Sequence, residues 1–326
     1  MRRNNFFNIH NYNDFDEFSL EIFQFQAKNC SVYKEFLSYL RVDINEIKSI
    51  NQIPYLPIQF FKSHKIVSSQ KRIERTFLSS GTTGSLQSKH YVTDISIYEK
   101  SFNKGFEYFY GNIEEYTVLA LLPSYLERDG SSLIYMANDL IKKSKKPKSG
   151  FYLNNLDELQ KTLSKLDEKG DKVLLIGVSF ALLDLVENHQ FQLKNTVIME
   201  TGGMKGRRKE LIREELHQIL CAGFGVEKIH SEYGMTELLS QAYSKGNGIF
   251  ECPPWMKILT RDTEDALTIL PQGKSGGINV IDLANINSCS FIATQDLGKT
   301  YENNTFEVLG RFDNSDIRGC NLMVLK

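Results

Sequence analysis

Three short apolar runs, each followed by a loop and a helical pattern, constrain the fold of this chain more than any other feature. The runs occupy residues 116–122, 172–177 and 195–200, and they contain β-branched residues. Helical patterns follow at residues 179–186 and 209–220. Short buried strands that alternate with helices predict a parallel sheet with helices on its faces. We therefore expect an α/β fold.

The two ends of the chain add a helical segment and an antiparallel one. Residues 15–40 carry apolar and aromatic side chains at helical spacing, which predicts one or two helices packed on the core. After Cys252 the pattern changes to short strands separated by glycine and asparagine turns, which is typical of antiparallel sheet. We expect these strands at residues 266–270, 277–282, 290–294 and 305–309.

Composition is consistent with a sizeable core and excludes several classes of protein. Of the 326 residues, 41% are apolar, and the formal net charge is −1. This balance argues against a general nucleic-acid or anionic-membrane binder. No run of ~18 apolar residues is present, so we expect no membrane span. The basic N-terminus lacks the apolar segment of a secretion signal, and we expect a cytoplasmic protein.

A loop rich in hydroxyl groups and glycine follows a predicted strand end at residues 75–78. It reads Ser79, Ser80, Gly81, Thr82, Thr83, Gly84 and Ser85. The glycines lack a Cβ and let the backbone close on a ligand, while the hydroxyls and amides can surround phosphate oxygens. The usual phosphate loop ends in Gly-Lys-Ser/Thr, which is absent here. Taken alone, such a run is more often a solvated loop.

A second motif, at residues 233–237, favours a nucleotide-binding site. It reads Tyr233, Gly234, Met235, Thr236 and Glu237, after a short strand-like segment at residues 226–230. An aromatic ring can stack on a purine, a glycine gives access to the backbone, and a threonine can bind a phosphate. A glutamate can hold magnesium, a hard cation that prefers oxygen ligands. In isolation, Tyr233 could equally be a core aromatic residue.

Together the two motifs resemble the signature loops of the adenylate-forming enzymes, which include acyl-CoA and aryl-CoA ligases, firefly-type luciferases and the adenylation domains of peptide synthetases. Two later segments fit the same pattern in the same order. Residues 294–298 resemble the segment of the ribose-binding aspartate, here Asp296. Residues 310–313 resemble the segment of the ribose-contacting arginine, here Arg311, and of the interdomain hinge, here Asp313.

Residues 50–326 show a narrower resemblance, to the bacterial luminescence acyl-protein synthetases. It is carried by residues 53–64, 200–206 and 318–322. In that family a fatty acid is activated as acyl-AMP, moved to a cysteine near the C-terminus and passed to a partner reductase. The resemblance implies the adenylate-forming large-domain fold, with mixed, largely parallel sheets flanked by helices and an antiparallel C-terminal part. It divides the chain into a core, 1–310, and a hinge-like segment with a short tail, 311–326.

The resemblance also implies ATP and Mg²⁺ as cofactors and gives individual residues their roles. Glu237 would hold the magnesium and Thr236 would bind the α-phosphate, while Asp296 and Arg311 would fix the ribose. The adenine would lie against Tyr233 and against the backbone of Gly202 and Gly203, which follow a predicted strand and so stand where ligands bind in α/β sheets. Without the resemblance, a glycine pair is as often a plain turn, and a lone aspartate or arginine on a loop more often forms a surface salt bridge.

The chain departs from the wider pattern in two ways. Many relatives continue the Thr-Thr-Gly loop with Pro-Lys, whereas here Lys89 lies two residues later than usual. The next residue, His90, could help to bind the substrate carboxylate, although we favour a structural histidine. The chain also ends 13 residues after Asp313, so the mobile C-terminal domain with its catalytic lysine is expected to be missing or vestigial. Lys205 could supply that positive charge.

Cys320 is the candidate acyl acceptor. It stands six residues from the C-terminus, thiolates attack activated acyl groups well, and the nearby Arg318 would favour the thiolate. The alternative is an inert cysteine in a terminal strand. The five cysteines are scattered without a Cys-x-x-Cys pair, so neither a disulfide framework nor a zinc site is expected.

The leading hypothesis is an ATP-dependent acyl-protein synthetase that activates a carboxylic acid, with a fatty acid as the expected substrate. Its partner would be an acyl-accepting reductase or a carrier protein. One alternative is an acyl- or aryl-CoA ligase with a reduced C-terminus. Another, from a different class, is a nucleotide-binding module without turnover that feeds or regulates a partner.

Overall fold

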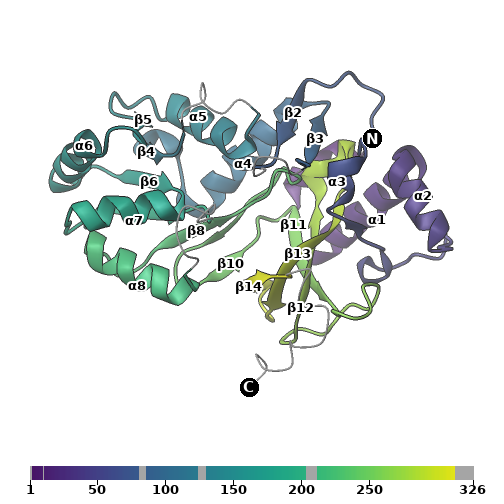
Figure 1. Ribbon diagram of the computed structural model, residues 1–326. Helices are drawn as coiled ribbons and strands as arrows, with labels where there is room; N and C mark the ends of the chain where they lie inside the picture. Colours follow the sequence, from purple (N-terminus) through teal and green to yellow (C-terminus); the bar gives the residue numbers. More distant parts are fainter. Residues whose placement is uncertain (1, 10, 81–85, 124–129, 203–210, 313–326) are drawn as a thin grey trace.

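Twelve strands of the described part of the chain form one sheet, in the computed structural model shown in Figure 1. The structure describes residues 2–9, 11–80, 86–123, 130–202 and 211–312. Within these residues the helices are η1 (Arg2–Asn8), α1 (Tyr12–Asn29), α2 (Ser31–Tyr39), η2 (Ile50–Gln52), α3 (Phe60–Ser63), α4 (Ile95–Tyr110), η3 (Ile113–Glu115), α5 (Ser132–Ser144), α6 (Leu156–Glu168), α7 (Ser179–Asn188), α8 (Arg213–Phe224) and η4 (Leu283–Asn287).

The strands follow the order β11-β12-β13-β14-β10-β9-β8-β7-β6-β4-β5, and β1 pairs with β13 outside this path. A separate hairpin is formed by β2 and β3. Their bounds are β1 (Leu56–Pro57), β2 (Arg75–Leu78), β3 (Lys89–Val92), β4 (Thr117–Leu121), β5 (Gly150–Phe151), β6 (Val173–Gly177), β7 (Thr196–Glu200), β8 (His230–Tyr233), β9 (Ala242–Ser244), β10 (Ile249–Glu251), β11 (Met256–Arg261), β12 (Ser275–Asp282), β13 (Phe291–Thr300) and β14 (Thr305–Arg311).

One half of the sheet is parallel, as the alternating pattern predicts. β4 pairs in parallel with β5 and β6, β6 with β7, and β7 with β8. Every residue of β4 and β6 is buried, which explains their continuous apolar sequences. The helices α5 to α8 lie around this half (Figure 1). The carboxyl ends of β6, β7 and β8 therefore open on the same edge of the sheet.

The other half is antiparallel, and the N-terminal helices pack beside it. From β8 through β9, β10, β14, β13 and β12 to β11, each neighbouring pair runs antiparallel. The predicted helical segment forms α1 and α2, which lie next to β13 in Figure 1. Phe23 of α1 and Tyr33 of α2 both contact Phe291 of β13 through their rings. The predicted α/β class, with its antiparallel C-terminal part, is confirmed.

Two strand predictions were wrong. Residues 266–270 make only one bridge, between Arg261 and Ile269, and the strand in this region is β11 instead. The Asp262 carboxylate accepts the backbone N–H groups of Glu264 and Asp265, so the chain turns locally at this point.

The second error concerns the strand before Tyr233, which was placed at residues 226–230. It is β8, and Tyr233 is its last residue. Helix α8 ends at Phe224 and is capped by Gly225, which has a φ of +67°, and the chain needs several further residues before it reaches the sheet.

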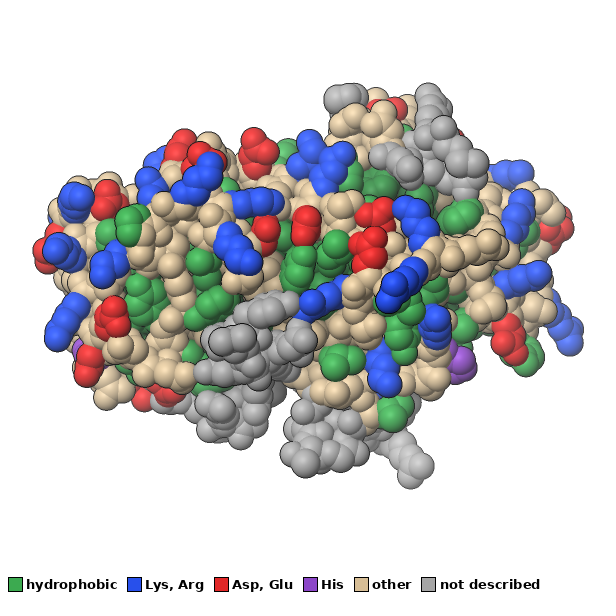
Figure 2. All heavy atoms as spheres, turned by 90° about the horizontal axis from the view of Figure 1, so that it is seen from above, with side chains coloured by type: hydrophobic (Ala, Val, Ile, Leu, Met, Phe, Trp, Pro, Cys, Tyr) green, Lys and Arg blue, Asp and Glu red, His purple; other side chains and the backbone are tan. Residues whose placement is uncertain are grey.

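The surface carries charges of both signs. Figure 2 shows Lys and Arg side chains interspersed with Asp and Glu side chains on the face that it presents. This mixture matches the formal net charge of −1. In the part of the chain that the structure describes, no helix has the length and apolar character to cross a membrane.

Candidate active site

Three of the predicted nucleotide-binding side chains meet near the middle of the sheet. Asp296 of β13 stands opposite Arg311, the last residue of β14, and its Oδ1 lies 3.2 Å from Arg311 Nε. The hydroxyl of Tyr233 donates a hydrogen bond to Asp296 Oδ2 at 2.9 Å. Asp296 and Arg311 were expected on loops, but both lie on strands. Strand pairing fixes their separation more firmly than a loop would.

Burial shapes the charge of this group. The Asp296 side chain is 9% exposed and that of Arg311 is 77% exposed, so the arginine reaches toward solvent. Burial raises the pKa of Asp296, while Arg311, Tyr233 and Arg261 act in the opposite direction. Tyr233 itself is buried, and its ring packs edge-on against Phe306. Its predicted stacking on adenine stays a prediction.

Arg261 of β11 is a member of this site that the sequence did not indicate. It donates hydrogen bonds to the carbonyl oxygens of Ile278 and Thr294, at 2.8 and 2.6 Å. Burial lowers the pKa of Arg261 to about 10, and the Asp296 carboxylate opposes that change. The side chain is therefore still charged at neutral pH. A single arginine at the end of a strand carries no motif, so only the fold could place it here.

Glu237 lies beside the base of the hydroxyl-rich loop. It is 6% exposed, and burial raises its pKa, whereas a hydrogen bond from Ser88 and the charges of Arg311 and Lys62 lower it. Ser88 in turn pairs with Ser79: the Ser79 N–H donates to the Ser88 carbonyl, and the Ser88 N–H donates to Ser79 Oγ at 2.9 Å. Of the predicted loop residues, Ser79 is half-buried and Ser80 is exposed. Gly81, Thr82, Thr83 and Gly84 lie outside the described residues.

His90 and Thr236 are joined through the backbone. His90 Nδ1 donates to the Thr236 carbonyl oxygen at 2.8 Å, so this nitrogen carries the proton in the neutral ring. The side chain is fully buried, and burial lowers the pKa of His90 to about 4. This is the arrangement of a structural histidine that holds the loop. A direct contact between His90 and the substrate carboxylate stays a prediction, as does phosphate binding by Thr236.

Gly202 stands two residues beyond the end of β7, as predicted. Its φ is +71°, and no atom of the described residues lies within 4 Å of the place where a Cβ would be. Its backbone is therefore open on that side. Gly234, directly after β8, is different, because a Cβ there would lie 2.3 Å from Glu232 Oε1. Gly203 and Lys205 lie outside the described residues.

Two interacting acids, the buried Glu200 and the half-buried Glu232, were also missed. Glu200 Oε2 accepts the Gly202 N–H at 2.6 Å, and its Oε1 lies 3.7 Å from His217 Nε2. Burial acts to raise the pKa of Glu200, but hydrogen bonds from His217, Ser231 and Gly202 lower it overall. Burial and the Glu200 carboxylate raise the pKa of Glu232 to about 8.

The described residues contain no group of three or more His, Cys, Asp or Glu side chains that could hold a metal ion. Magnesium does not need such a group, because it is commonly bound by one or two carboxylates together with substrate phosphates and water. The single Glu237 carboxylate, beside the predicted phosphate loop, fits that pattern. Cys320 and Asp313 lie outside the described residues.

Solved structures with a similar fold include a CoA ligase. The chain resembles the ATP-bound structure of MatB from Rhodopseudomonas palustris, with a TM-score of 0.56, 17% identity, and coverage of 74% of this chain and 49% of that chain. It spans about half the length of the MatB structures. It also resembles 2-hydroxyisobutyryl-CoA ligase in complex with 2-HIB-AMP, with a TM-score of 0.68, 12% identity, and coverage of 96% and 70%. At these identities the likeness shows the adenylate-forming fold alone.

The comparison of sequences is more specific. None of the curated proteins is a significant match to the chain. One family model, described as acyl-protein synthetase, LuxE, matches residues 10–326. That match includes the four motifs and the segments between them. The chain therefore belongs to the LuxE family of acyl-protein synthetases.

Proposed function

We propose that this protein uses ATP to activate a carboxylic acid as its acyl-adenylate and then transfers the acyl group to a thiol. The observation that carries the proposal is the meeting of Asp296, Tyr233 and Arg311 close to Glu237 and the base of the hydroxyl-rich loop. These residues come from four separate segments of the sequence, in the order in which the adenylate-forming pattern has them. Membership of the LuxE family supports the same activity.

The first step requires that charge be neutralised. An oxygen of the carboxylate attacks the α-phosphorus of ATP, the bond to the bridging oxygen breaks, and pyrophosphate leaves. Carboxylate and triphosphate repel each other, so the site must offer positive charge and donors in fixed positions. Asp296 would accept bonds from the ribose hydroxyls, and the exposed Arg311 side chain would donate to the same sugar. Thr236 and the loop at residues 79–85 would hold phosphate oxygens.

Magnesium, when bound, would neutralise the phosphates and stabilise the leaving pyrophosphate. Glu237 is the residue that would hold it. Burial raises the pKa of Glu237, and Ser88, Arg311 and Lys62 counter that rise, so their removal would favour the protonated acid. We expect Glu237→Gln to lose the magnesium-dependent part of ATP stabilisation and to remain folded. Thermal denaturation with ATP, with and without magnesium, measures this; an unchanged magnesium effect would remove Glu237 from the metal site.

The second step requires a reactive thiolate. The thiolate attacks the acyl carbon of the adenylate, a thioester forms, and AMP leaves. Burial raises the pKa of each of the four described cysteines, which makes them poor nucleophiles at neutral pH. They are Cys30, Cys221, Cys252 and Cys289. This leaves Cys320 as the acceptor that we propose, with a reductase or carrier protein as the partner that receives the acyl group.

Two alternatives make different predictions. An acyl- or aryl-CoA ligase would consume coenzyme A in the second step, and a nucleotide-binding module would have no turnover. Exchange of labelled pyrophosphate into ATP, tested with a panel of carboxylic acids of increasing chain length, separates the enzymes from the module. Consumption of coenzyme A in the complete reaction then separates the two enzymes. We expect exchange that depends on the acid, and no consumption of coenzyme A. Binding of ATP without exchange for every acid would favour the module.

Labelling of the protein tests the acceptor. With ATP, magnesium and a labelled acid that supports exchange, the chain should acquire label that hydroxylamine removes. Cys320→Ser should abolish this label and keep pyrophosphate exchange, because activation and transfer use different groups. Cys221→Ser is the matched control and should label like the wild type. If Cys320→Ser also labels like the wild type, the acceptor is another group.

A further inference from the structure

The backbone that follows Glu237 is held by a buried carboxylate from outside the motif. Asp282, at the end of β12, has no exposed surface. Its Oδ2 accepts the N–H groups of Leu239 and Ser240, at 2.7 and 3.0 Å, and its Oδ1 accepts the Ser240 hydroxyl at 2.5 Å. Three donors from two consecutive residues therefore converge on one carboxyl group. Bonds to a charged acceptor in a buried place are the strong kind.

The backbone carbonyl groups of Thr236 and Glu237 are also held by side chains from outside the motif. Asp282 caps η4 by accepting the Ala284 N–H at 3.1 Å. From η4, Asn285 donates its Nδ2 to the Glu237 carbonyl oxygen at 2.7 Å. From β3, His90 donates to the Thr236 carbonyl oxygen. Three side chains thus fix the backbone from residue 236 to residue 240, in which Glu237 stands.

Helix η4 is itself anchored to α1. Gln26 of α1 is fully buried and donates its Nε2 to the carbonyl oxygens of Asn285 and Ile286, each at 3.0 Å. Its Oε1 accepts the Ser290 N–H at 2.9 Å. The residues that hold the backbone at positions 236–240 are therefore bonded to helix α1 as well as to the sheet.

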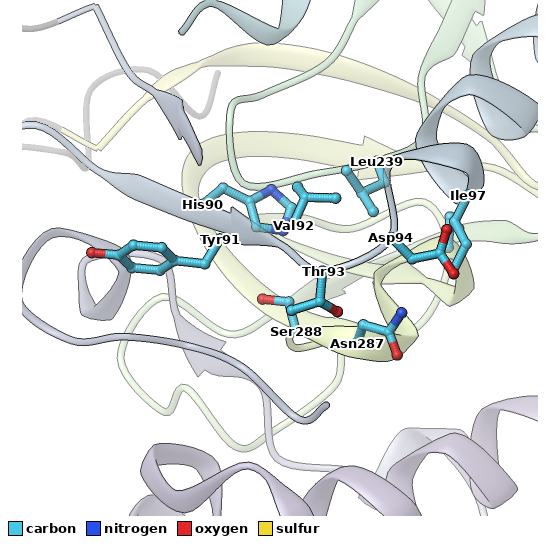
Figure 3. A pocket seen from close by; sticks show the side chains of 10 residues that line it. His90, Tyr91, Val92, Thr93, Asp94, Ile97, Leu239, Asn287 and Ser288 are labelled. Carbon is cyan, nitrogen blue, oxygen red and sulfur yellow. The ribbon is translucent and has the colours of Figure 1, made fainter. Parts of the chain in front are cut away.

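A small cavity adjoins this support. Between β3 and η4 lies a cavity of about 10 Å³, bounded by His90, Thr93, Leu239, Asn287 and Ser288 among others (Figure 3). That volume is about the smallest that holds a single water molecule. The loop cannot shift into this space without displacing the packed side chains.

We propose that Asp282 is a positioning residue for the adenylation reaction: its carboxylate holds the backbone after Glu237 so that Thr236 and Glu237 stand where the phosphates and their magnesium require them. This inference rests on the proposed function, because it is for that reaction that the two residues must be placed. Asp282 itself touches no reacting group. It acts through the loop.

The test compares two buried aspartates with similar bonding and different locations. Asp167, in α6, accepts the N–H groups of Lys194 and Asn195 and the Thr196 hydroxyl, at the amino end of β7 and thus at the opposite edge of the sheet. Asp282→Asn and Asp167→Asn each keep the shape of the side chain, lose its charge and place an N–H₂ group among donors. Both are expected to lower the melting temperature.

Three measurements separate a positioning role of Asp282 from a loss of overall stability. In Asp282→Asn, kcat for pyrophosphate exchange should fall about tenfold or more, since small displacements at a reacting centre have effects of that size. The magnesium concentration for half-maximal exchange should rise. Asp167→Asn should keep kcat within about twofold of the wild type. Amide hydrogen exchange should show lost protection at Leu239 and Ser240 in Asp282→Asn alone.

Different results would overturn the positioning role of Asp282 and the proposed function. Wild-type kcat in Asp282→Asn, or an equal loss of kcat in both variants, would overturn the positioning role. Should Asp282→Asn not fold, Ser240→Ala removes one of the three bonds; a fall in kcat of about threefold supports the role, and an unchanged kcat overturns it. If the wild type exchanges with no acid, the proposed function fails; protection at Leu239 and Ser240 then still decides whether Asp282 holds the loop.

Discussion

At the scale of single residues, the site depends on carboxylates whose surroundings set their roles. Asp296 accepts a hydrogen bond from Tyr233 and is paired with Arg311, whose side chain is exposed to solvent. Asp282 is enclosed by backbone donors, and burial raises its pKa to about 6. One acid is thus suited to binding and the other to holding the chain.

Removal of Asp296 tests its assignment to the ribose. Asp296→Ala should weaken ATP binding by ~1–3 kcal/mol, because the sugar hydroxyls lose a charged acceptor in a mostly buried place. Discrimination between ATP and its 2′,3′-dideoxy analogue should shrink in the same variant. Titration calorimetry measures both. Asp262→Ala, which removes a turn aspartate from the same half of the sheet, is the control and should bind ATP normally.

Glu232 allows a test of its interaction with Glu200 through pH. Its pKa is raised from 4.5 to about 8, so the folded protein binds this proton more tightly than the unfolded chain does. The stability that it contributes is therefore full below the unfolded value and is lost as pH rises through about 8. Glu232→Gln has no carboxyl group to lose this proton. The melting temperature of the variant, relative to that of the wild type, should therefore rise as pH increases from about 5 to about 9. A difference that is independent of pH would contradict the assignment.

At the scale of elements, strand pairing brings the site together. β13 and β14 place Asp296 opposite Arg311, and β8 ends with Tyr233 next to them. The β13–β14 ladder has an irregularity between Leu297 and Gly298, directly after Asp296. The absence of a side chain at Gly298 lets the two strands and Ile278 of β12 approach closely at this point.

A methyl group at Gly298 should therefore be disruptive. Its Cβ would lie 2.5 Å from the Glu307 carbonyl oxygen and 2.6 Å from Ile278 Cδ1. We expect Gly298→Ala to destabilise the fold by ~1–3 kcal/mol, the usual range for overpacking. In Gly105→Ala, within α4, the nearest atom would be 4.0 Å away, and a helix gains ~0.5–1 kcal/mol from this change. Chemical denaturation measures the free energy of unfolding of both variants. Equal stability of the two would contradict the close approach of β12, β13 and β14 at Gly298.

At the scale of the whole molecule, the sequence predicts the fold better than it predicts the support of the site. Periodicity identified the parallel half, because β4, β6 and β7 are apolar runs of strand length. The motifs predicted that Tyr233, Asp296 and Arg311 belong to one site, because their order along the chain is specific, and the structure brings the three side chains together. The positioning residue Asp282 and the half-buried Arg261 were not predicted, since each is a single polar residue at the end of its strand and belongs to no motif. Their partners are 43 residues away for Asp282 and 33 for Arg261, at Leu239 and Thr294, and no local pattern records such pairs.

The central claim is that the acid is activated as an acyl-adenylate, and the fate of one oxygen atom of the acid tests it most directly. The acid is supplied with a heavy-oxygen label in its carboxylate, together with ATP, magnesium and hydroxylamine as the final acceptor. Attack of the carboxylate on the α-phosphorus leaves one of its oxygens on the phosphate of AMP when the acyl group departs. We predict AMP that carries one labelled oxygen, measured by mass spectrometry, and unlabelled pyrophosphate. Label in inorganic phosphate, or AMP without label, would contradict activation through an acyl-adenylate.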